Sequence, residues 1–245
     1  MVTRVAIVGA SGRMGRLATR LVEESPDFEV HAAIGSTDAP DLVAGADVVL
    51  DVTVPAVSPG VVETALAHGV PVLVGTSGWT AERLASLEVR LRELPDLGVV
   101  VIPNFSLGSA VATMLSTIAA PYFDAIEIVE THHERKADSP SGTAIRTAEE
   151  IGRARASIGP VAAPHTDQRA RGQQVASVPV HSLRMAGISA EQEVIFGGHG
   201  ETVRVIHRTL TDASYEAGIL LGLRAATERR GLTVGLDKLL NLSAA

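Results

Sequence analysis

A glycine-rich turn near the N-terminus limits the possible folds of this chain more than any other feature. The segment VAIVGASGRMGRLATRLV places Gly9, Gly12 and Gly15 between a β-branched strand pattern and an amphipathic helix pattern. In such a setting the first glycine permits a sharp turn, the second lets backbone N–H groups approach a pyrophosphate, and the third lets helix and strand pack closely. The turn therefore predicts a dinucleotide-binding unit, although its Gly-x-x-Gly-x-x-Gly spacing also suits a tight connection with no ligand.

The hydrophobic pattern predicts two domains. Short apolar runs alternate with amphipathic stretches in the first half, as in parallel strands joined by helices, whereas the strands after Pro103 follow one another with the alternation typical of antiparallel pairing. We expect strands at 2–8, 28–34, 47–52, 71–74, 98–102, 125–130, 175–184, 188–196 and 202–207, and helices at 13–24, 59–68, 80–94, 108–120, 141–156 and 214–228.

These elements predict an α/β protein with an N-terminal Rossmann-like doubly wound parallel sheet and an α+β open-sheet substrate domain. The dinucleotide-binding domain is expected to comprise residues 1–104 with 212–245, because the last apolar helix suits a sheet face of the first domain. Residues 105–211 are expected to form the substrate-binding and oligomerisation domain. The Pro-, Ala- and Gly-rich stretch 159–174 is expected to be a loop.

Composition excludes several classes of protein. Twenty-eight acidic against 21 basic residues give a formal charge of −7, which does not suit a nucleic-acid-binding protein. No apolar run approaches the roughly 20 residues that span a bilayer, and the N-terminus enters a strand pattern without a secretory signal, so we expect a cytoplasmic protein that does not bind membranes. The absence of cysteine excludes a disulfide framework, a thiolate metal site and a cysteine nucleophile.

The end of the second predicted strand bears on the choice between NADH and NADPH. An acid there accepts hydrogen bonds from the adenosine ribose hydroxyls, but this chain has Gly35 and Ser36 at that place, with Asp38 close by. Arg13, just inside the glycine turn, is either a cation for a 2′-phosphate or a solvated charge at the helix start. The residues leave the choice of cofactor open.

The densest cluster of polar chemistry is the segment ETHHERKADSPSGTA, residues 130–144. His132 and His133 point to opposite sides if the strand conformation persists, and an imidazole exchanges protons near neutral pH. Lys136 adds a cation, and Ser141-Gly142-Thr143 at a helix start offers backbone N–H groups to an anion. Together these residues indicate a receptor for a small dicarboxylate beside a proton donor.

Two other interpretations of this segment remain open. Paired histidines also bind metal, for which Asp138 is the only nearby acid with a plausible reach, and the Ser-Pro-Ser-Gly-Thr string suits an ordinary helix start. We expect no metal site.

Five segments together resemble the 4-hydroxy-tetrahydrodipicolinate reductase (dihydrodipicolinate reductase) family. They are VGASGRMG, DVTVP at 51–55, VGTSGW at 74–79, IPNFSLG at 102–108 and ETHHERKADSPSGTA at 130–144. The resemblance implies an enzyme of lysine and diaminopimelate biosynthesis that passes a hydride from NADPH or NADH to a cyclic unsaturated dicarboxylate. It also implies a homotetramer in which the sheet of the substrate domain joins subunits.

The resemblance also implies roles for individual residues. His132 corresponds to the proton donor and Lys136 to its assisting cation, while the carboxylate binders are His133, Ser141, Gly142 and Thr143. The cofactor is expected to lie against Gly9, Ser11, Gly12, Arg13, Met14, Gly15, Gly35, Ser36, Thr53, Gly75, Thr76, Ser77, Pro103, Asn104 and Phe105.

The chain departs from the family pattern at three positions. Ser139 stands where the family usually has alanine, Asp212 stands where relatives commonly carry arginine, and Gly35 replaces the usual acid. Two other functions are compatible with the glycine turn, an NAD(P)-dependent dehydrogenase of an amino acid such as aspartate and a nucleotide sensor that has lost catalysis. The complete His-His-x-x-Lys and Ser-Gly-Thr constellation argues against the dehydrogenase.

Overall fold

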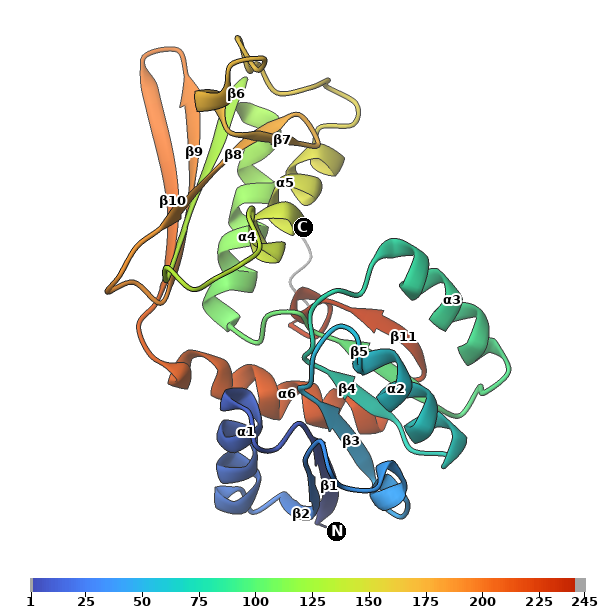
Figure 1. The fold of residues 1–245 in the computed structure, drawn as a ribbon. Coiled ribbons are helices and arrows are strands. Elements are labelled where there is room, and N and C mark those ends of the chain that lie inside the picture. The colour runs from blue at the N-terminus through green and yellow to red at the C-terminus, as the bar shows by residue number, and fades with distance from the viewer. Residues whose placement is uncertain (1, 241–245) are drawn as a thin grey trace. The chain divides into compact units, whose positions relative to one another are not determined.

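A computed structural model describes residues 2–240, which form two compact units (Figure 1). Unit 1 comprises 2–107 with 215–240, and unit 2 comprises 108–214. Residues 241–245 of the predicted dinucleotide-binding domain lie outside the described residues.

Unit 1 contains a six-stranded, wholly parallel sheet in the order β11-β5-β4-β3-β1-β2. Its elements are β1 (Thr3–Val8), α1 (Arg13–Glu24), β2 (Phe28–Ile34), β3 (Val48–Asp51), α2 (Ser58–Ala67), β4 (Val72–Val74), α3 (Ala81–Arg92), β5 (Gly98–Val101), α6 (Glu216–Glu228) and β11 (Gly231–Val234). The chain leaves β1 for β2 on one side and then returns to β3 on the other. The order therefore reverses between β1 and β3, where doubly wound folds bind their ligands.

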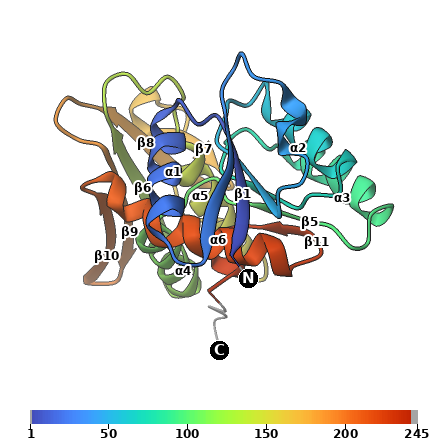
Figure 2. The same ribbon diagram turned by 90° about the horizontal axis from the view of Figure 1, so that it is seen from below.

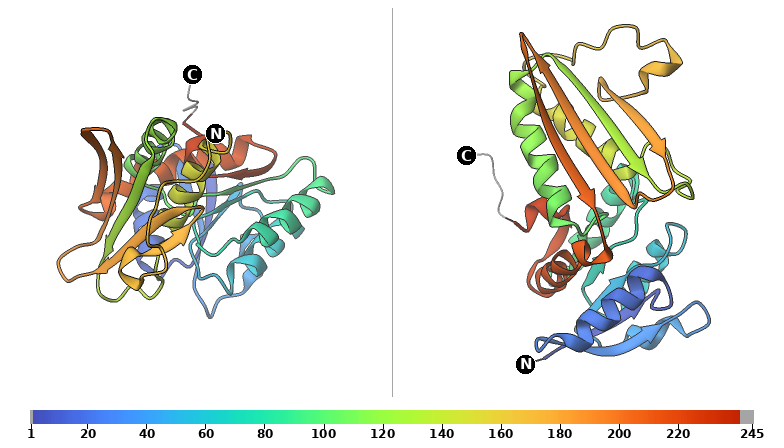
Figure 3. Two further views of the ribbon diagram at one scale, coloured as in Figure 1. Left: turned by 90° about the horizontal axis from the view of Figure 1, so that it is seen from above. Right: turned by 90° about the vertical axis from the view of Figure 1, so that its left-hand side faces the viewer.

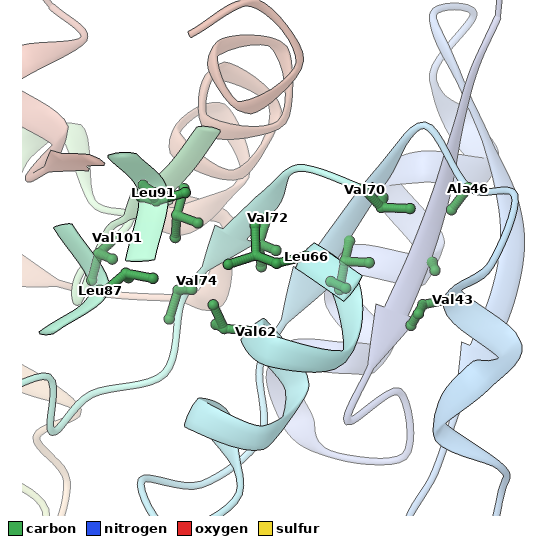
Figure 4. Packing of buried hydrophobic residues seen from close by; sticks show 14 of the residues in the cluster. Val43, Ala46, Val62, Leu66, Val70, Val72, Val74, Leu87, Leu91 and Val101 are labelled. Atoms are coloured by element: carbon green, nitrogen blue, oxygen red, sulfur yellow. The ribbon is translucent and has the colours of Figure 1, made fainter. Parts of the chain in front are cut away.

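The sequence of the central strands explains why both faces of this sheet are covered. All residues of β3, β4 and β5 are buried, and most of them are valine or leucine, as expected of parallel strands with helices on both sides. On one side Val62 and Leu66 of α2 and Leu87 and Leu91 of α3 pack against the strand valines (Figure 4). Figures 1 and 2 show α1 and α6 together on the opposite side.

Unit 2 contains a five-stranded mixed sheet in the order β10-β9-β6-β8-β7, with α4 and α5 along one face (Figure 3). Its elements are α4 (Leu107–Ala119), β6 (Ala125–His132), α5 (Gly142–Ala154), β7 (Gln173–Val175), β8 (Val178–Arg184), β9 (Ala190–Gly198) and β10 (Glu201–Thr209). The core between helices and sheet includes Ile126, Ile128, Ile151 and Phe196.

The fold class is confirmed, but two details differ from the sequence prediction. The strand expected over 175–184 is broken by a turn in which Ala176 and Ser177 adopt positive φ angles of 47° and 70°, which separates β7 from β8. The expected antiparallel succession is also incomplete, because β8 pairs with β6 in parallel and β9 pairs with the other edge of β6. Strand β11 was not predicted, since its four residues follow the last helix closely.

Helix α6 approaches the sheet closely because it carries glycines at the contact. A Cβ on Gly218 would lie 1.8 Å from the Phe105 carbonyl oxygen, and one on Gly222 would lie 2.9 Å from the Leu73 methyl carbons. The first neighbour is backbone and cannot turn aside, so Gly218 fixes how near the helix lies to the chain that follows β5.

We expect Gly218→Ala to lower the free energy of unfolding by about 3 kcal/mol, because the methyl group forces the helix off its backbone neighbour. Gly60→Ala is the matched control. Both glycines are the third residue of their helices, but a Cβ on Gly60 has nothing within 4 Å, so this variant should gain up to about 1 kcal/mol from helix propensity. Denaturant unfolding measures both, and equal effects would refute the close approach.

Candidate active site

The centre of the site in unit 2 is Glu130, which is fully buried on β6. Residues two apart on a strand share a face, so Glu130 and His132 project to the same side of the sheet. The Nδ1 atom of His132 lies 2.5 Å from Oε2 of Glu130, while the His132 side chain keeps 17% of its exposure. The histidine is thus held on one side by a carboxylate and remains accessible on the other.

Arg184, on the neighbouring strand β8, clamps the same carboxylate. Its Nη1 and Nη2 atoms donate to Oε2 and Oε1 of Glu130 at 3.0 and 2.9 Å. The parallel register places Arg184 opposite His132, which explains why its guanidinium reaches Glu130. A bidentate arginine–carboxylate pair fixes geometry as well as charge.

The guanidinium of Arg184 also holds the loop that follows β6. It donates to the carbonyl oxygens of Asp138 at 2.6 Å and of Lys136 at 3.4 Å. Within the loop the Lys136 ammonium lies 2.7 Å from the Asp138 carboxylate, and the Ser139–Pro140 peptide bond is cis. Asp138, the candidate third metal ligand, is therefore paired with a lysine, and no cluster of three metal-ligating side chains occurs within residues 2–240.

The N-terminus of α5 joins the same carboxylate from a third side. The Ser141 N–H donates to Oε1 of Glu130 at 3.2 Å, and the Ser141 hydroxyl caps the helix by accepting from the Ala144 N–H. A Cβ at Gly142 would meet nothing within 4 Å, so this first turn is open to a ligand. With Thr143 beside it, the turn directs backbone N–H dipoles outwards, as an anion site requires.

The charge of Glu130 is secured by its partners. Burial alone would raise the pKa of this carboxyl, but hydrogen bonds from His132, Arg184 and Ser182 outweigh it and lower the pKa to about 2. Lys136 similarly lowers the pKa of Asp138 against the effect of its partial burial. Both carboxyl groups are therefore ionised at neutral pH.

In unit 1 the glycine turn has the geometry that a dinucleotide needs. Gly9 has a φ of 91°, and a Cβ on it would lie 2.7 Å from the Val52 carbonyl oxygen, whereas one on Gly15 would lie 2.1 Å from the Gly9 oxygen. Gly12 caps α1 without a side chain, so the helix N-terminus is open to a phosphate. The turn lies where the strand order reverses, and its residues therefore fit a dinucleotide.

The other predicted cofactor residues follow the carboxyl ends of neighbouring parallel strands. Thr53 follows β3, Gly75 with Thr76 and Ser77 follows β4, and the segment 103–105 follows β5, so all of them lie at one edge of the sheet. The ring of Phe105 is buried against Gly75, where a Cβ would lie 2.5 Å from it.

A buried carboxylate orders this edge as well. The Oδ1 atom of Asp51 accepts from the Thr53 N–H at 3.0 Å, from the Thr53 hydroxyl at 2.6 Å and from the Thr76 hydroxyl at 3.1 Å, while its Oδ2 accepts from the Ser58 hydroxyl. Asp51 is fully buried at the end of β3. It ties the loop after β3 to the loop after β4.

The end of β2 carries the residues that distinguish the two nicotinamide cofactors. The Asp38 carboxylate turns back and accepts from the Gly35 N–H at 2.7 Å, with Ser36 and Thr37 exposed between them. The Arg13 guanidinium lies 5.8 Å from the centre of the Tyr215 ring, a cation–π distance. An acid therefore does stand at the end of β2, four residues after Ile34.

Family models for the two halves of one enzyme match the chain almost from end to end. Residues 3–105 match "Dihydrodipicolinate reductase, N-terminus" and residues 100–240 match "Dihydrodipicolinate reductase, C-terminus". The chain belongs to the dihydrodipicolinate reductase family. It is therefore an NAD(P)H-dependent oxidoreductase with unit 1 as its Rossmann cofactor domain.

Individual members of the family are similar over the whole length. The 4-hydroxy-tetrahydrodipicolinate reductase of Clavibacter michiganensis subsp. michiganensis is 59% identical over 242 residues, which are 99% of this chain and 87% of the relative. That of Streptomyces coelicolor is 45% identical over 98% of both chains. A dipicolinate-bound dihydrodipicolinate reductase from Paenisporosarcina sp. TG-14 is 30% identical, covers 97% of this chain and 99% of its own, and superposes with a TM-score of 0.79.

Sequence reasoning singled out the histidines, Lys136 and the helix start of this reductase. It missed Glu130 and Arg184, which hold them, and Asp51, which orders the loops after β3 and β4. Glu130 could have been found from its i, i+2 spacing to His132 on one strand. Arg184 could not, because its position depends on the parallel pairing of β8 with β6. Asp51 stands in the quoted DVTVP segment, but nothing in the sequence shows that its carboxylate is buried.

The depressed pKa of Glu130 predicts a pH dependence of stability. The pKa of this carboxyl group falls from 4.5 to about 2 on folding. At pH values above 4.5 the shift adds up to about 3 kcal/mol to the free energy of unfolding, and this stabilisation is lost as the pH falls towards 2. We expect the free energy of unfolding to fall less steeply between about pH 5 and pH 3 in Glu130→Gln than in the parent. Denaturant titrations at each pH measure this, with Glu88→Gln on the exposed side of α3 as control. Parallel pH profiles for parent and Glu130→Gln would contradict the buried charge.

Proposed function

We propose that this protein reduces 4-hydroxy-tetrahydrodipicolinate, or the dihydrodipicolinate formed from it by loss of water, to tetrahydrodipicolinate in lysine and diaminopimelate biosynthesis. The observation that carries the proposal is the pair of the buried Glu130 with Arg184, which holds His132, the Lys136 loop and the N-terminus of α5 at one place. These are a proton donor, a cation and an anion-binding helix end, as a dicarboxylate reductase needs. The dipicolinate-bound relative supports a dicarboxylate ligand.

His132 is the proposed proton donor. Reduction of the ring double bond adds a hydride to one atom, and the electron pair of that bond moves to the other atom, where a proton must follow. An imidazolium at that atom supplies the proton and becomes neutral. Lys136 stabilises the negative charge that develops before the proton arrives, because its ammonium extends from a loop fixed by Arg184.

The first turn of α5 is the proposed carboxylate site. Backbone N–H groups of Gly142 and Thr143 stand in the first turn of this helix, and the positive end of the helix dipole favours a carboxylate there. Ser141 fixes this turn by its cap and by its bond to Glu130. His133 is exposed after the end of β6, where it can contact the second carboxylate.

Unit 1 holds the proposed dinucleotide site. When bound, the reduced nicotinamide supplies the hydride. The glycine turn binds the pyrophosphate through its backbone, and the loops at Thr53, Gly75 and Asn104 enclose the nicotinamide end. Asp51 keeps two of these loops in place through Thr53 and Thr76.

The proposed enzyme is a homotetramer located in the cytoplasm. The face of the unit 2 sheet away from α4 and α5 presents apolar side chains, among them Leu183 and Ile206, which keep 45% and 48% of their exposure. Further copies of the chain covering this face would give the homotetramer implied by the family resemblance. No helix within residues 2–240 is long and apolar enough to cross a membrane; consumption of NAD(P)H supports a cytoplasmic location.

We expect His132→Ala to lower kcat about 10²–10⁴-fold, with a much smaller effect on KM, because general acid catalysis acts in the transition state. The assay follows oxidation of the cofactor with substrate made freshly by the preceding aldolase-type reaction. His199→Ala, in the turn between β9 and β10, is the control histidine. A parent enzyme that binds cofactor but turns over no dicarboxylate would refute the proposed function, and undiminished kcat in His132→Ala would refute the proton donor.

For the cofactor we expect use of both nucleotides, with kcat/KM for NADPH at least equal to that for NADH. Arg13 can pair with the 2′-phosphate, whereas Asp38 opposes it, so Arg13→Ala should lower kcat/KM for NADPH about 10-fold, as loss of one charge-assisted contact would. Asp38→Ala should shift the ratio the other way. Arg20→Ala, two turns further along α1, is the control. A tenfold preference of the parent for NADH, or an Arg13→Ala variant unchanged with NADPH, would contradict this assignment.

A further inference from the structure

Glu130 lies where it can affect proton transfer to the substrate through its contact with His132. Its carboxylate is fully buried, accepts two hydrogen bonds from Arg184, one from the Ser141 N–H and one from Ser182, and contacts Nδ1 of His132. A carboxylate only accepts hydrogen bonds, so Nδ1 carries the hydrogen in this contact. The nitrogen left for proton exchange with a substrate is therefore Nε2.

We infer that Glu130, clamped by Arg184, is a positioning residue that fixes the ring of His132 with Nε2 towards the substrate. This inference rests on the proposed role of His132 as proton donor. Glu130 itself touches neither substrate nor cofactor. Its effect on catalysis passes through the imidazole.

The charges around His132 make Glu130 its anionic partner. Arg184 of strand β8 forms an ion pair with Glu130, and Lys136 of the loop after β6 forms an ion pair with Asp138. Strand β9 places Ala190 opposite His132, while the adjacent Glu191 pairs with Arg208 of β10. Helix α4 has no charged residue, and the first charged residue of α5 is Arg146, one turn from the helix start.

The same strand provides a matched comparison. Glu127 binds Arg171 and contacts Nε2 of His181 at 2.7 Å, so it forms a second Glu–Arg–His group of the same chemistry. Glu127 lies three positions before Glu130 on the strand, so its side chain points to the opposite face of β6. Arg171 belongs to the segment between α5 and β7, so the Glu127 group fastens that segment to the sheet. Glu127→Gln therefore controls for the loss of a Glu–Arg–His group on the face of β6 that does not carry His132.

The decisive experiment compares these two variants in the NADPH-dependent assay. We expect Glu130→Gln to lower kcat about 10–100-fold, a part of the 10²–10⁴-fold effect of a general acid, while the Kd for dipicolinate changes less than about 3-fold. The solvent isotope effect on kcat should rise because proton transfer becomes slower, and Glu127→Gln should leave all three readouts at parental values.

The double variant separates this inference from the proposed function. If Glu130 acts through His132, Glu130→Gln adds no further loss of kcat in a His132→Gln background, because the two residues act as a unit. A large loss in His132→Gln with parental kcat and solvent isotope effect in Glu130→Gln would overturn the inference and leave the proposed function standing. Parental kcat in His132→Gln would overturn the inference together with the role of His132 as proton donor, whereas a parent enzyme that turns over no dicarboxylate would overturn the proposed function.

A measurement on the parent protein keeps the inference testable even if Glu130→Gln fails to fold. Nitrogen NMR of the histidine-labelled parent, with the His132 signals assigned from their loss in His132→Gln, reports which ring nitrogen carries hydrogen in the neutral form. Hydrogen on Nδ1 supports the inference. Hydrogen on Nε2 alone overturns it, because the ring would then not donate to Glu130.

Discussion

The ion pair between the buried Glu130 and the partly exposed Arg184 is the interaction on which the substrate unit depends. Its carboxylate contacts His132 and the Ser141 N–H, and its guanidinium holds the carbonyls of Lys136 and Asp138. One pair thus links strands β6 and β8, the loop between β6 and α5, and the start of α5. A displacement of this pair would move the proton donor, the cation and the anion site together.

The dinucleotide unit applies the same device with a different residue. Asp51 ends β3 as a buried carboxylate, and its acceptors are filled by hydroxyl and N–H donors of Thr53, Ser58 and Thr76. Loops at the carboxyl ends of parallel strands lack a ladder of their own, so a buried acceptor with several donors is an efficient way to fix them. In both units the sheet brings the loops of the site together, and a buried acid near the end of a strand fixes them by hydrogen bonds.

The parts that the sequence predicted are those set by local patterns. Periodicity located most strands and helices, the glycine turn indicated the Rossmann unit, and the 130–144 segment indicated the candidate site because its polar residues are contiguous. The break between β7 and β8 escaped prediction since Ala176 and Ser177 are not typical residues for positive φ. Arg184 escaped prediction because a residue 54 positions from Glu130 becomes its partner only through strand pairing. The sequence also does not show that the Asp38 carboxylate accepts a hydrogen bond from the Gly35 N–H.

Stability alone does not account for a charged pair at the centre of unit 2. Removing two charges from water is costly, and replacing a buried pair by apolar residues of similar volume is often neutral or stabilising, although breaking one partner costs about 3–5 kcal/mol. Two apolar side chains in place of Glu130 and Arg184 could fill the volume between β6 and α5. They could not accept from His132 and Ser141 or donate to the loop carbonyls. The pair therefore orients the candidate site in a way that packing alone would not, because each of its hydrogen bonds holds a different part of that site.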